Sequence, residues 1–318
     1  MSFTMSDIIN IILPFFALVV TGYVAARLTI IESSGILGLN RFVYFFALPA
    51  LLFSKMALTP VEQVLGEETF ALAYLASGLL VFAIGWVMAK VLFRMSADKL
   101  SVMALSGCYA NIGFMGIPVL VTILGAKAAA PLSIMLMIDV AFFIPFATTL
   151  IDLLRAERRQ GEARNGQVLS AVVTSVVKNP LIIAIVLGFT FSATGIGLPG
   201  AIGGFTNLLG QAAAPAAMFA LGAVLAGRPM SEGMGEVAYM SVVKLAVHPL
   251  VMWWGMTLFG VGAEWRLAVT LGAATPVAAS MFVIAQEYKA LPVRVSTAVL
   301  LTTAVSMITL PLLIAWLN

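Results

Sequence analysis

Residues 110–118 read Ala-Asn-Ile-Gly-Phe-Met-Gly-Ile-Pro and lie inside a long apolar stretch of the chain. Two glycines and a proline this close together disfavour a continuous helix, because proline removes a backbone donor and glycine costs backbone entropy. The surrounding stretch, 99–124, is nevertheless long enough to cross a membrane as a helix. These residues therefore predict a membrane-spanning helix that is interrupted near its middle.

A second interruption is predicted in the apolar stretch at 265–288, where Gly272 is followed by Ala-Ala-Thr-Pro and then by Ser280. A helix that breaks inside a membrane leaves unpaired N–H groups and a partial positive charge at the start of its second half. Two such ends that meet would attract an anion such as a carboxylate. The alternative is an ordinary proline kink whose free backbone groups are satisfied by neighbouring helices.

The whole chain has the composition of an integral membrane protein. Of its 318 residues, 62% are hydrophobic and only 10% are charged, whereas soluble domains are about 25% charged. Ten continuous apolar stretches predict an all-α membrane protein with ten spans, and not the alternating strands of a β-barrel. They lie near 7–27, 36–58, 69–93, 99–124, 130–154, 168–193, 200–227, 236–260, 265–288 and 293–317.

This composition argues against several other classes of protein. The basic residues form no cluster of the kind that a nucleic-acid-binding face needs. Cys108 is the only cysteine and His248 the only histidine, which leaves little material for a metal site or a Ser-His-Asp triad. The sequence also contains no H-E-x-x-H and no G-x-S-x-G motif. We therefore expect no enzyme, no cofactor, no metal and no nucleic-acid partner.

Basic residues gather in alternate loops between the predicted spans. The loops after the first, third, fifth, seventh and ninth spans carry most of them, and the opposite loops carry only Lys55, Lys127 and Arg266. The positive-inside rule then places the odd-numbered loops in the cytoplasm and both termini on the other side of the membrane. We expect the lipid bilayer to surround a single domain, residues 1–318.

Prolines recur in the second half of the chain at the spacing that they have in the first half. Three pairs are separated by 166 residues, and the same offset relates a glycine pair and a phenylalanine pair; these are Pro14/Pro180, Pro49/Pro215, Pro145/Pro311, Gly22/Gly188 and Phe53/Phe219. Shared composition of membrane helices is the alternative explanation. With five spans in each half, a duplication predicts two inverted repeats, 1–154 and 168–318, joined by a cytoplasmic loop at 155–167.

Several stretches resemble motifs of the auxin efflux carrier family, which lies within the bile acid, arsenite and riboflavin transporter-like superfamily. Residues 39–53 resemble its second-span signature and 111–118 its fourth-span motif, while 178–180 and 244–249 resemble its sixth- and eighth-span motifs. The resemblance implies that helices 4 and 9 cross at the substrate site. It also implies that a mobile bundle moves, elevator-like, against a scaffold that often dimerises. The short loop at 155–167 is typical of bacterial members, which implies an inner-membrane location with periplasmic termini.

Paired interruptions in corresponding spans are the strongest sequence pointer to a transport site. Asn111 would supply an amide donor there, and the resemblance implies that it contacts the substrate carboxylate. Asn40 is either a second contact or a hydrogen bond between helices. The expected substrate-binding residues are Asn111, Gly113, Gly116, Pro118, Thr275, Pro276, Ser280 and Asn40.

Ionisable residues inside the membrane are functional candidates because their burial is costly. Asp139 lies deep in the fifth span and would hold a coupling proton or Na⁺; alternatively it is a structural carboxylate that faces Lys178, Lys244 or a serine. His248 would titrate near neutral pH, or else it is a packed, hydrogen-bonded residue. Lys178 is a third coupling candidate, and the alternative is that it braces the bundle.

Taken together, these features predict a secondary transporter of a small organic anion that works by alternating access. The expected substrate is a mono- or dicarboxylate such as malate, malonate or an auxin-like acid, the first two because the resemblance implies them. A sodium- or proton-coupled carrier of a bile-acid-like or vitamin-like solute is the alternative. A channel is a further class, which a continuous polar stripe along several spans would favour.

Overall fold

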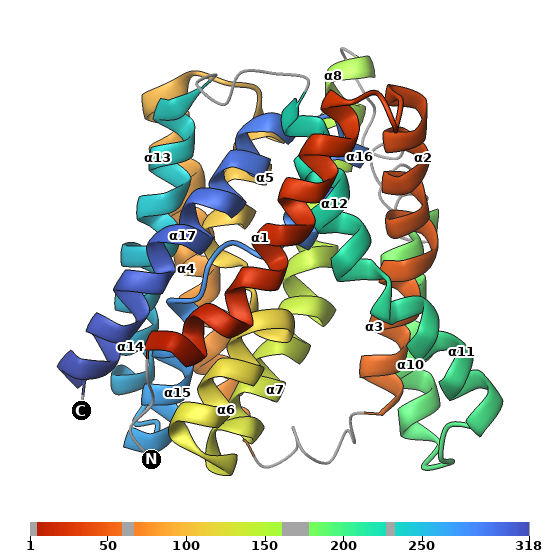
Figure 1. The fold of residues 1–318 in the computed structure, drawn as a ribbon. Helices are drawn as coiled ribbons and strands as arrows, with labels where there is room; N and C mark the ends of the chain where they lie inside the picture. The colour runs from red at the N-terminus through yellow and green to blue at the C-terminus, as the bar shows by residue number, and fades with distance from the viewer. Residues whose placement is uncertain (1–4, 59–66, 161–177, 227–232, 318) are drawn as a thin grey trace.

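The computed structural model describes residues 5–58, 67–160, 178–226 and 233–317, which fold into helices that stand side by side (Figure 1). These residues contain no strand, apart from one isolated bridge between Ala110 and Val277. Six helical stretches are long and apolar enough to cross a membrane, which confirms the all-helical membrane class. They are Ser33–Ala57, Glu68–Phe93, Ala129–Arg155, Gly200–Ala226, Met234–Leu258 and Pro292–Leu317.

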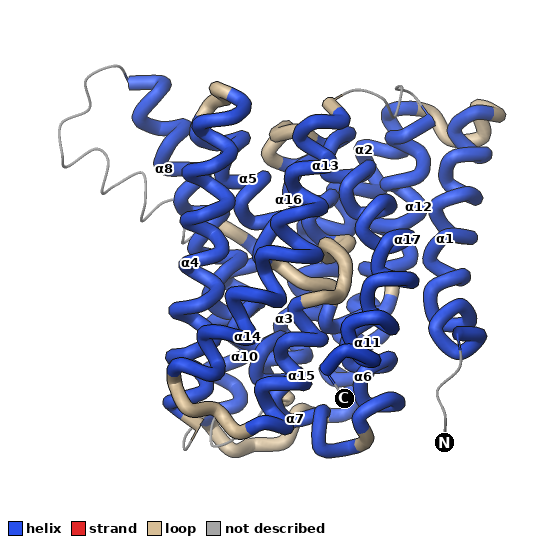
Figure 2. The backbone as a smooth tube through the Cα atoms, turned by 90° about the vertical axis from the view of Figure 1, so that its left-hand side faces the viewer, coloured by secondary structure: helices blue, strands red, loops and turns tan. Residues whose placement is uncertain are grey.

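The other predicted spans are not among these six stretches. The first corresponds to α1 (Met5–Arg27), and the sixth to α10 (Pro180–Ala193), which is preceded by residues outside the described ranges. The fourth is divided into α5 (Ala97–Cys108) and α6 (Ile117–Leu124), and the ninth into α15 (Ala263–Ala273) and α16 (Ser280–Glu287). Both predicted interruptions are therefore present, and Figure 2 shows loop segments in the middle of the helical array.

Single wide turns precede four prolines of the described chain. The π-helical turns η1 (Val43–Ala47), η3 (Ile112–Gly116), η5 (Asp139–Phe143) and η6 (Val243–Val247) each end two residues before a proline. Proline lacks the N–H that would bond back to the preceding turn, and its ring clashes with the carbonyl four residues earlier. In each case that carbonyl falls inside the wide turn, so the helix continues beyond the proline instead of ending.

The described helices pack in two groups, and each group takes helices from both halves of the chain. The first bundle contains α1, α10 and four further helices: α2 (Ser33–Phe42), α3 (Leu48–Ala57), α11 (Gly200–Gln211) and α12 (Ala213–Ala226). The second bundle contains α5, α6, α15, α16 and six further helices: α4 (Glu68–Phe93), α7 (Ala129–Ile138), α8 (Ile144–Gln160), α13 (Met234–Val242), α14 (His248–Leu258) and α17 (Pro292–Leu317). In Figure 1, α2, α3, α10 and α11 stand at the right.

Helix α8 continues to Gln160, into the segment expected to be a loop at 155–167, whose remaining residues lie outside the described ranges.

Large apolar side chains such as Leu208, Leu258 and Trp316 are exposed on the outside. An apolar outer surface suits a protein whose solvent is lipid.

Candidate substrate-binding site

The two helix breaks lie against each other. The backbone N–H of Asn111 donates to the carbonyl oxygen of Pro276 at 2.9 Å, and the N–H of Ala278 donates to the carbonyl of Tyr109 at 3.3 Å. The bridge between Ala110 and Val277 joins the same two segments in antiparallel orientation. The backbone groups released by each break are thus partly satisfied by the other break, which fixes the two segments together.

A pocket opens beside the joined breaks, between the two bundles, and encloses about 640 Å³ of empty space including its mouth. We call it the inner pocket. The first bundle contributes residues of α3 and α10 to it, and the second bundle contributes both breaks together with α7, η5, α8 and α16. Its lining residues are Leu48, Leu51, Leu52, Lys55, Tyr109, Ala110, Asn111, Gly113, Leu136, Val140, Ile144, Leu181, Ala278, Ser280 and Ile284. Most of these are apolar, so the few polar groups will decide what binds.

Asn111 is a polar side chain that the fold brings to the inner pocket from the first break. Only 4% of the residue is exposed, and its Oδ1 atom is buried without a hydrogen-bond partner. A buried amide that lacks a partner is costly, and a 180° rotation can present either its oxygen or its nitrogen to the pocket. Its own carbonyl accepts hydrogen bonds from Met115 and Gly116, which starts the second half of the broken helix. Asn111 is thus placed to bind a polar ligand group.

Two other predicted residues share this pocket. Ser280 is the first residue of α16 and is 7% exposed, so its hydroxyl lies at the start of the second half-helix of the other break. Gly113 lines the pocket opposite Leu136, where an added methyl group would be in ordinary contact with the leucine side chain at 3.5 Å. The structure therefore brings Asn111, Gly113 and Ser280 together, as the sequence suggested.

Of the other predicted substrate residues, Gly116, Thr275, Pro276 and Asn40 do not line the inner pocket. Thr275 is fully buried, and its hydroxyl donates to the carbonyl of Gly272 at 2.7 Å, so it satisfies its own turn. Gly116 faces Thr275, Pro276 accepts the Asn111 backbone bond, and Pro118 lies in the first turn of α6. These residues shape the breaks. Asn40 is buried in α2 with both amide atoms unpaired and does not line the pocket.

A cluster of ionisable side chains lies behind the breaks. Oδ1 of Asp139 accepts a hydrogen bond from the hydroxyl of Tyr74 at 2.6 Å, while Oδ2 is buried without a partner. The carboxylate also interacts electrostatically with Lys244. Both residues are fully buried. The sequence did not identify Tyr74 as the partner of Asp139, because only the packing of α4 against η5 brings them together.

Lys244 connects this cluster to the second break. Its Nζ lies 3.1 Å from Nδ1 of His248 and also donates to the carbonyl oxygen of Ala273. Ala273 is the last residue of α15, where unpaired carbonyls and the negative end of the helix dipole accumulate. A cation at this point stabilises the helix end. His248 is fully buried, and its Nε2 atom has no partner.

Lys178 lies apart from the cluster of Asp139 and His248. It is not buried, although it falls inside a predicted span. It is exposed and lines a separate pocket with polar residues near the end of α8, including Asp152, Arg155 and Glu287. The sequence placed Lys178 inside a predicted span because Lys-Asn-Pro follows an apolar run, although Asn179 already caps the start of α10. This location fits the bracing alternative better than a buried coupling site.

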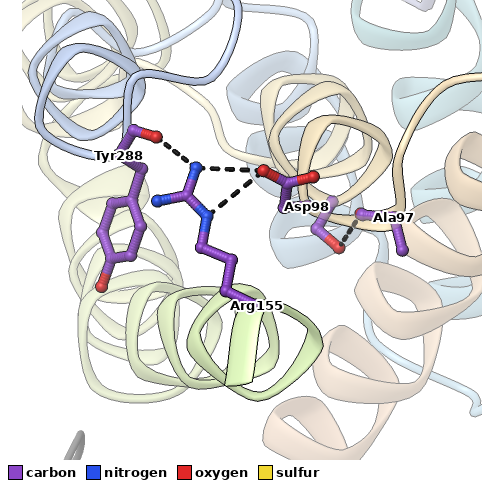
Figure 3. A network of polar contacts seen from close by, with 5 residues as sticks. Ala97, Asp98, Arg155 and Tyr288 are labelled. Atoms are coloured by element: carbon purple, nitrogen blue, oxygen red, sulfur yellow. Dashed lines mark hydrogen bonds and ion pairs between the residues drawn. The ribbon is translucent and has the colours of Figure 1, made fainter. Parts of the chain in front are cut away.

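Beside that pocket, Arg155 joins three helices of the second bundle (Figure 3). Its guanidinium binds Oδ2 of Asp98 at 3.0 Å and the backbone carbonyl of Tyr288. Burial raises the pKa of Asp98, but hydrogen bonds from Ser96 and the Arg155 guanidinium outweigh this effect and hold the pKa below its usual value. The side chain of Tyr288 in turn donates to Asp152 at 3.1 Å. The network ties α5, α8 and the end of α16 together.

Sequence reasoning missed Lys55, which lines the inner pocket from the last turn of α3. In the sequence, Lys55 lies near the end of an apolar stretch and resembles an ordinary loop charge. Its position opposite Asn111 depends on the packing of α3 against the second bundle. No local sequence signal distinguishes it from an ordinary charge at the end of a span.

The described residues thus define a multi-pass helical membrane protein in which two broken helices border a small, mostly apolar pocket. Residues 7–314 match the family described as "Membrane transport protein". The chain belongs to this family, which confirms the resemblance to the auxin efflux carriers.

Two relatives of the chain are described as transporters. The chain is 30% identical over 306 residues to a protein of Rhizobium meliloti (strain 1021) named "Putative malonate transporter", covering 96% of this chain and 94% of that one. It is 27% identical over 279 residues to "Uncharacterized transporter YfdV" of Escherichia coli (strain K12), covering 87% of each. The family and these relatives are transporters, not enzymes.

Proposed function

We propose that the protein is a secondary transporter of a small organic anion and that the inner pocket binds the substrate. The observation that carries this proposal is the buried amide of Asn111, whose Oδ1 atom has no hydrogen-bond partner, in a pocket between two helical bundles. An amide nitrogen turned toward the pocket would donate to a carboxylate, and the Ser280 hydroxyl would donate from the other break. The starts of the two second half-helices add a partial positive charge beside it.

We infer further that the chain is an inverted repeat of ten spans. The offset of 166 residues relates the contact between Gly22 and the backbone of Phe219 to the contact between Gly188 and the backbone of Phe53. It also maps the bridged pair Ala110 and Val277 onto residues 276 and 111, the adjacent pair in the same antiparallel register. A two-fold axis in the membrane plane would pass between the two breaks, where inverted-repeat transporters bind their substrates.

Transport would then proceed by movement of the second bundle against the first. Asn111 and Ser280 belong to the second bundle, so a bound acid would travel with it, while α3 and α10 of the first bundle form the opposite wall. Such an elevator-type movement exposes one site to each side of the membrane in turn. The first bundle would be the scaffold. By the family resemblance, two copies of the protein would form a homodimer through this bundle.

Coupling to an ion gradient is proposed for the buried cluster. One carboxylate oxygen of Asp139 has no partner. Asp139 interacts electrostatically with Lys244, which in turn donates a hydrogen bond to Ala273 at the second break. Binding of H⁺ or Na⁺ at Asp139 would change the charge beside Lys244. This would change the strength of the hydrogen bond from Lys244 to the carbonyl of Ala273 at the end of α15. His248 would share this role through its contact with Lys244. Lys178 would act only from the edge of the bundle.

The substrate class is tested by a binding screen on the purified protein. Thermal unfolding in detergent is followed with C3–C6 mono- and dicarboxylates, with indole acetate as the auxin-like acid and taurocholate and riboflavin as members of the alternative classes. Saturable stabilisation by a small carboxylate supports the proposal, because a ligand that binds only the folded state raises the unfolding midpoint. Stabilisation by taurocholate or riboflavin alone would favour the alternative carrier.

A further inference from the structure

A groove runs along the surface of the second bundle, between α14, α15 and α17, and it encloses about 1200 Å³ of empty space including its mouth. We call it the surface groove. All of its described lining residues belong to the second bundle, and none of them lines the inner pocket. In Figure 1 the three helices lie toward the left, away from α3, α10 and α11 of the first bundle. The groove is thus separate from the proposed substrate site.

The surface groove would face lipid in a membrane. It lies between two apolar stretches that are long enough to span a bilayer, Met234–Leu258 and Pro292–Leu317. Trp254 and Trp316 line it and are 69% and 73% exposed, and none of its described lining residues is charged. Such a surface lies against hydrocarbon in the membrane core. Since the proposed homodimer would form through the first bundle, acyl chains are the molecules that would fill the groove.

Tryptophans indicate where the groove meets the membrane surface. Trp253 and Trp254 lie in the second half of α14, and Trp316 lies one residue before the end of α17. Tryptophan gathers at the level of the lipid headgroups. The groove also reaches Ala274, which caps α15 at the second break. A lipid would therefore place its headgroup beside the tryptophans and extend an acyl chain toward the break.

Arg266 supplies a positive charge at the tryptophan end. Its guanidinium carbon lies 4.6 Å from the centre of the Trp253 ring, and its Nη1 atom lies 3.4 Å from the hydroxyl of Thr257 in the last turn of α14. Its Nε atom is buried without a hydrogen-bond partner. Among the described residues, no carboxylate forms an ion pair with Arg266. A guanidinium in this state suits a phosphate group, whose oxygens accept two N–H bonds in parallel.

The position of Arg266 in its helix argues against a purely local role. The residue lies near the start of α15, where the helix dipole disfavours a cation. Glu264 lies two residues before it but pairs with Lys127, at 3.1 Å. An anion from outside the protein would offset both the dipole and the missing partner.

A second polar group lies within the groove. Thr309 of α17 lines it, and the hydroxyl of this residue is buried without a hydrogen-bond partner. Thr309 precedes Trp316 by about two helical turns, so its hydroxyl lies below the headgroup level. The ester oxygens of a phospholipid lie just inside the phosphate and would accept a hydrogen bond there.

We propose that the surface groove binds one anionic phospholipid, with its phosphate at Arg266 and an acyl chain between α14 and α17. The lipid would pack against Ala274 and so stabilise the second break from outside the inner pocket. Because every wall of the groove belongs to the second bundle, the lipid would stay bound when this bundle moves against the first. The assignment does not depend on what the inner pocket binds.

Lipid affinity is measured by native mass spectrometry of the purified protein, titrated with dioleoyl phosphatidylglycerol or dioleoyl phosphatidylcholine. The two lipids share acyl chains and a phosphate, but only phosphatidylglycerol has a net negative charge. We expect the wild type to prefer phosphatidylglycerol and Arg266→Gln to reduce this preference about fivefold, the effect of one cation on an anionic lipid. Arg266→Lys should keep most of it. Arg27→Gln is the matched control and should keep all of it, because Arg27 also lies over a ring, that of Tyr23, but at the end of α1.

A bulky side chain tests the groove separately from the charge. Ala246 lines the groove and is exposed, so Ala246→Trp should fill part of it and weaken binding of both lipids. The matched control is Ala304→Trp, at an exposed alanine of α17 that does not line the groove. Thermal unfolding shows whether each variant is folded. Phosphatidylglycerol should raise the unfolding midpoint of the wild type and of Ala304→Trp more than that of Ala246→Trp.

Three results would overturn the lipid site. An unchanged preference in Arg266→Gln would show that this arginine does not hold the headgroup. Equal lipid affinity of Ala246→Trp and Ala304→Trp would show that the lipid binds elsewhere. Loss of a dimer in Ala246→Trp, with lipid binding unchanged, would assign the groove to a second copy of the chain. None of these results changes the expectation for Asn111, so the transport proposal is tested independently.

Discussion

Asn111 lines the inner pocket from the second bundle and presents a neutral amide to it. Asn111 is a buried neutral amide whose Oδ1 atom has no hydrogen-bond partner, and with its nitrogen turned toward the pocket it would donate to a carboxylate. Recognition by a neutral amide near two helix ends avoids the desolvation cost of a fully buried cation.

At the scale of the residue, Asp139→Asn tests ion coupling. The substitution keeps the shape of the side chain and the contact with the Tyr74 hydroxyl but removes the titratable charge. We expect substrate exchange across a vesicle membrane to continue, while accumulation driven by an H⁺ or Na⁺ gradient is lost. The measurement is uptake into proteoliposomes with and without an imposed gradient.

The control for this experiment is Tyr74→Phe, which removes the hydrogen bond and leaves the carboxylate. Gradient-driven accumulation should survive in this variant, although its dependence on pH should shift. Full accumulation by the Asp139→Asn protein would show that the coupling ion binds elsewhere.

Single residues of the site were only partly predictable from the sequence. Asn111, Gly113 and Ser280 were found because an interrupted span is visible as glycine, proline and polar residues within an apolar run. Thr275 and Asn40 carried the same signal but lie outside the pocket, since hydroxyl and amide groups in membranes often serve backbone or helix contacts. Lys55 was missed because its position depends on how the bundles pack.

At the scale of the element, prolines and glycines determine both the breaks and the close contacts between helices. Prolines after wide π-helical turns allow helices to continue, whereas the segments at 109–111 and 274–279 leave the helix and pair with each other. The sequence showed where the helices would be interrupted. It could not show that η1, η5 and η6 would widen without breaking, because neighbouring helices decide how the released carbonyls are satisfied.

Helix packing in the first bundle predicts a strong effect of Gly188→Val. A Cβ atom at Gly188 would lie 2.8 Å from the carbonyl oxygen of Phe53 and 2.7 Å from Cβ of Met56. Helices α10 and α3 would have to separate, so we expect a loss of about 1–3 kcal/mol of stability. The change is measured as a lower midpoint of thermal unfolding in detergent.

The matched control is Gly204→Val in α11, because a Cβ atom at Gly204 would meet nothing within 4 Å. Its unfolding midpoint should stay close to that of the wild type. Equal midpoints for both variants would mean that α10 and α3 do not pack as closely as described.

At the scale of the whole molecule, the two bundles form opposite walls of the inner pocket. Each bundle combines helices from both halves of the chain, an arrangement that an inverted duplication would produce directly. The sequence predicts the offset and ten spans. The division into two bundles could not be read from it, because helices far apart in the chain, such as α1 and α12, pack in the same bundle.

The orientation of the molecule gives a further prediction. In a Cys108→Ser background, Gly197→Cys should react with a membrane-impermeant maleimide on intact cells. Ser34→Cys, on the opposite side of the predicted topology, should react only after the cells are opened. Both positions are exposed, so reactivity reports the side of the membrane. The reverse pattern would place the termini in the cytoplasm and reject the positive-inside assignment.

The most direct test of the central claim is counterflow of labelled malonate in proteoliposomes that contain wild type, Asn111→Ala or Asn111→Asp. We expect saturable counterflow in the wild type and an affinity about 10- to 100-fold weaker in Asn111→Ala, since a hydrogen bond to a charged group is lost. Asn111→Asp keeps the shape but adds a negative charge, so counterflow should disappear while the protein remains folded. Undiminished counterflow by Asn111→Asp would contradict an anion site at the paired breaks.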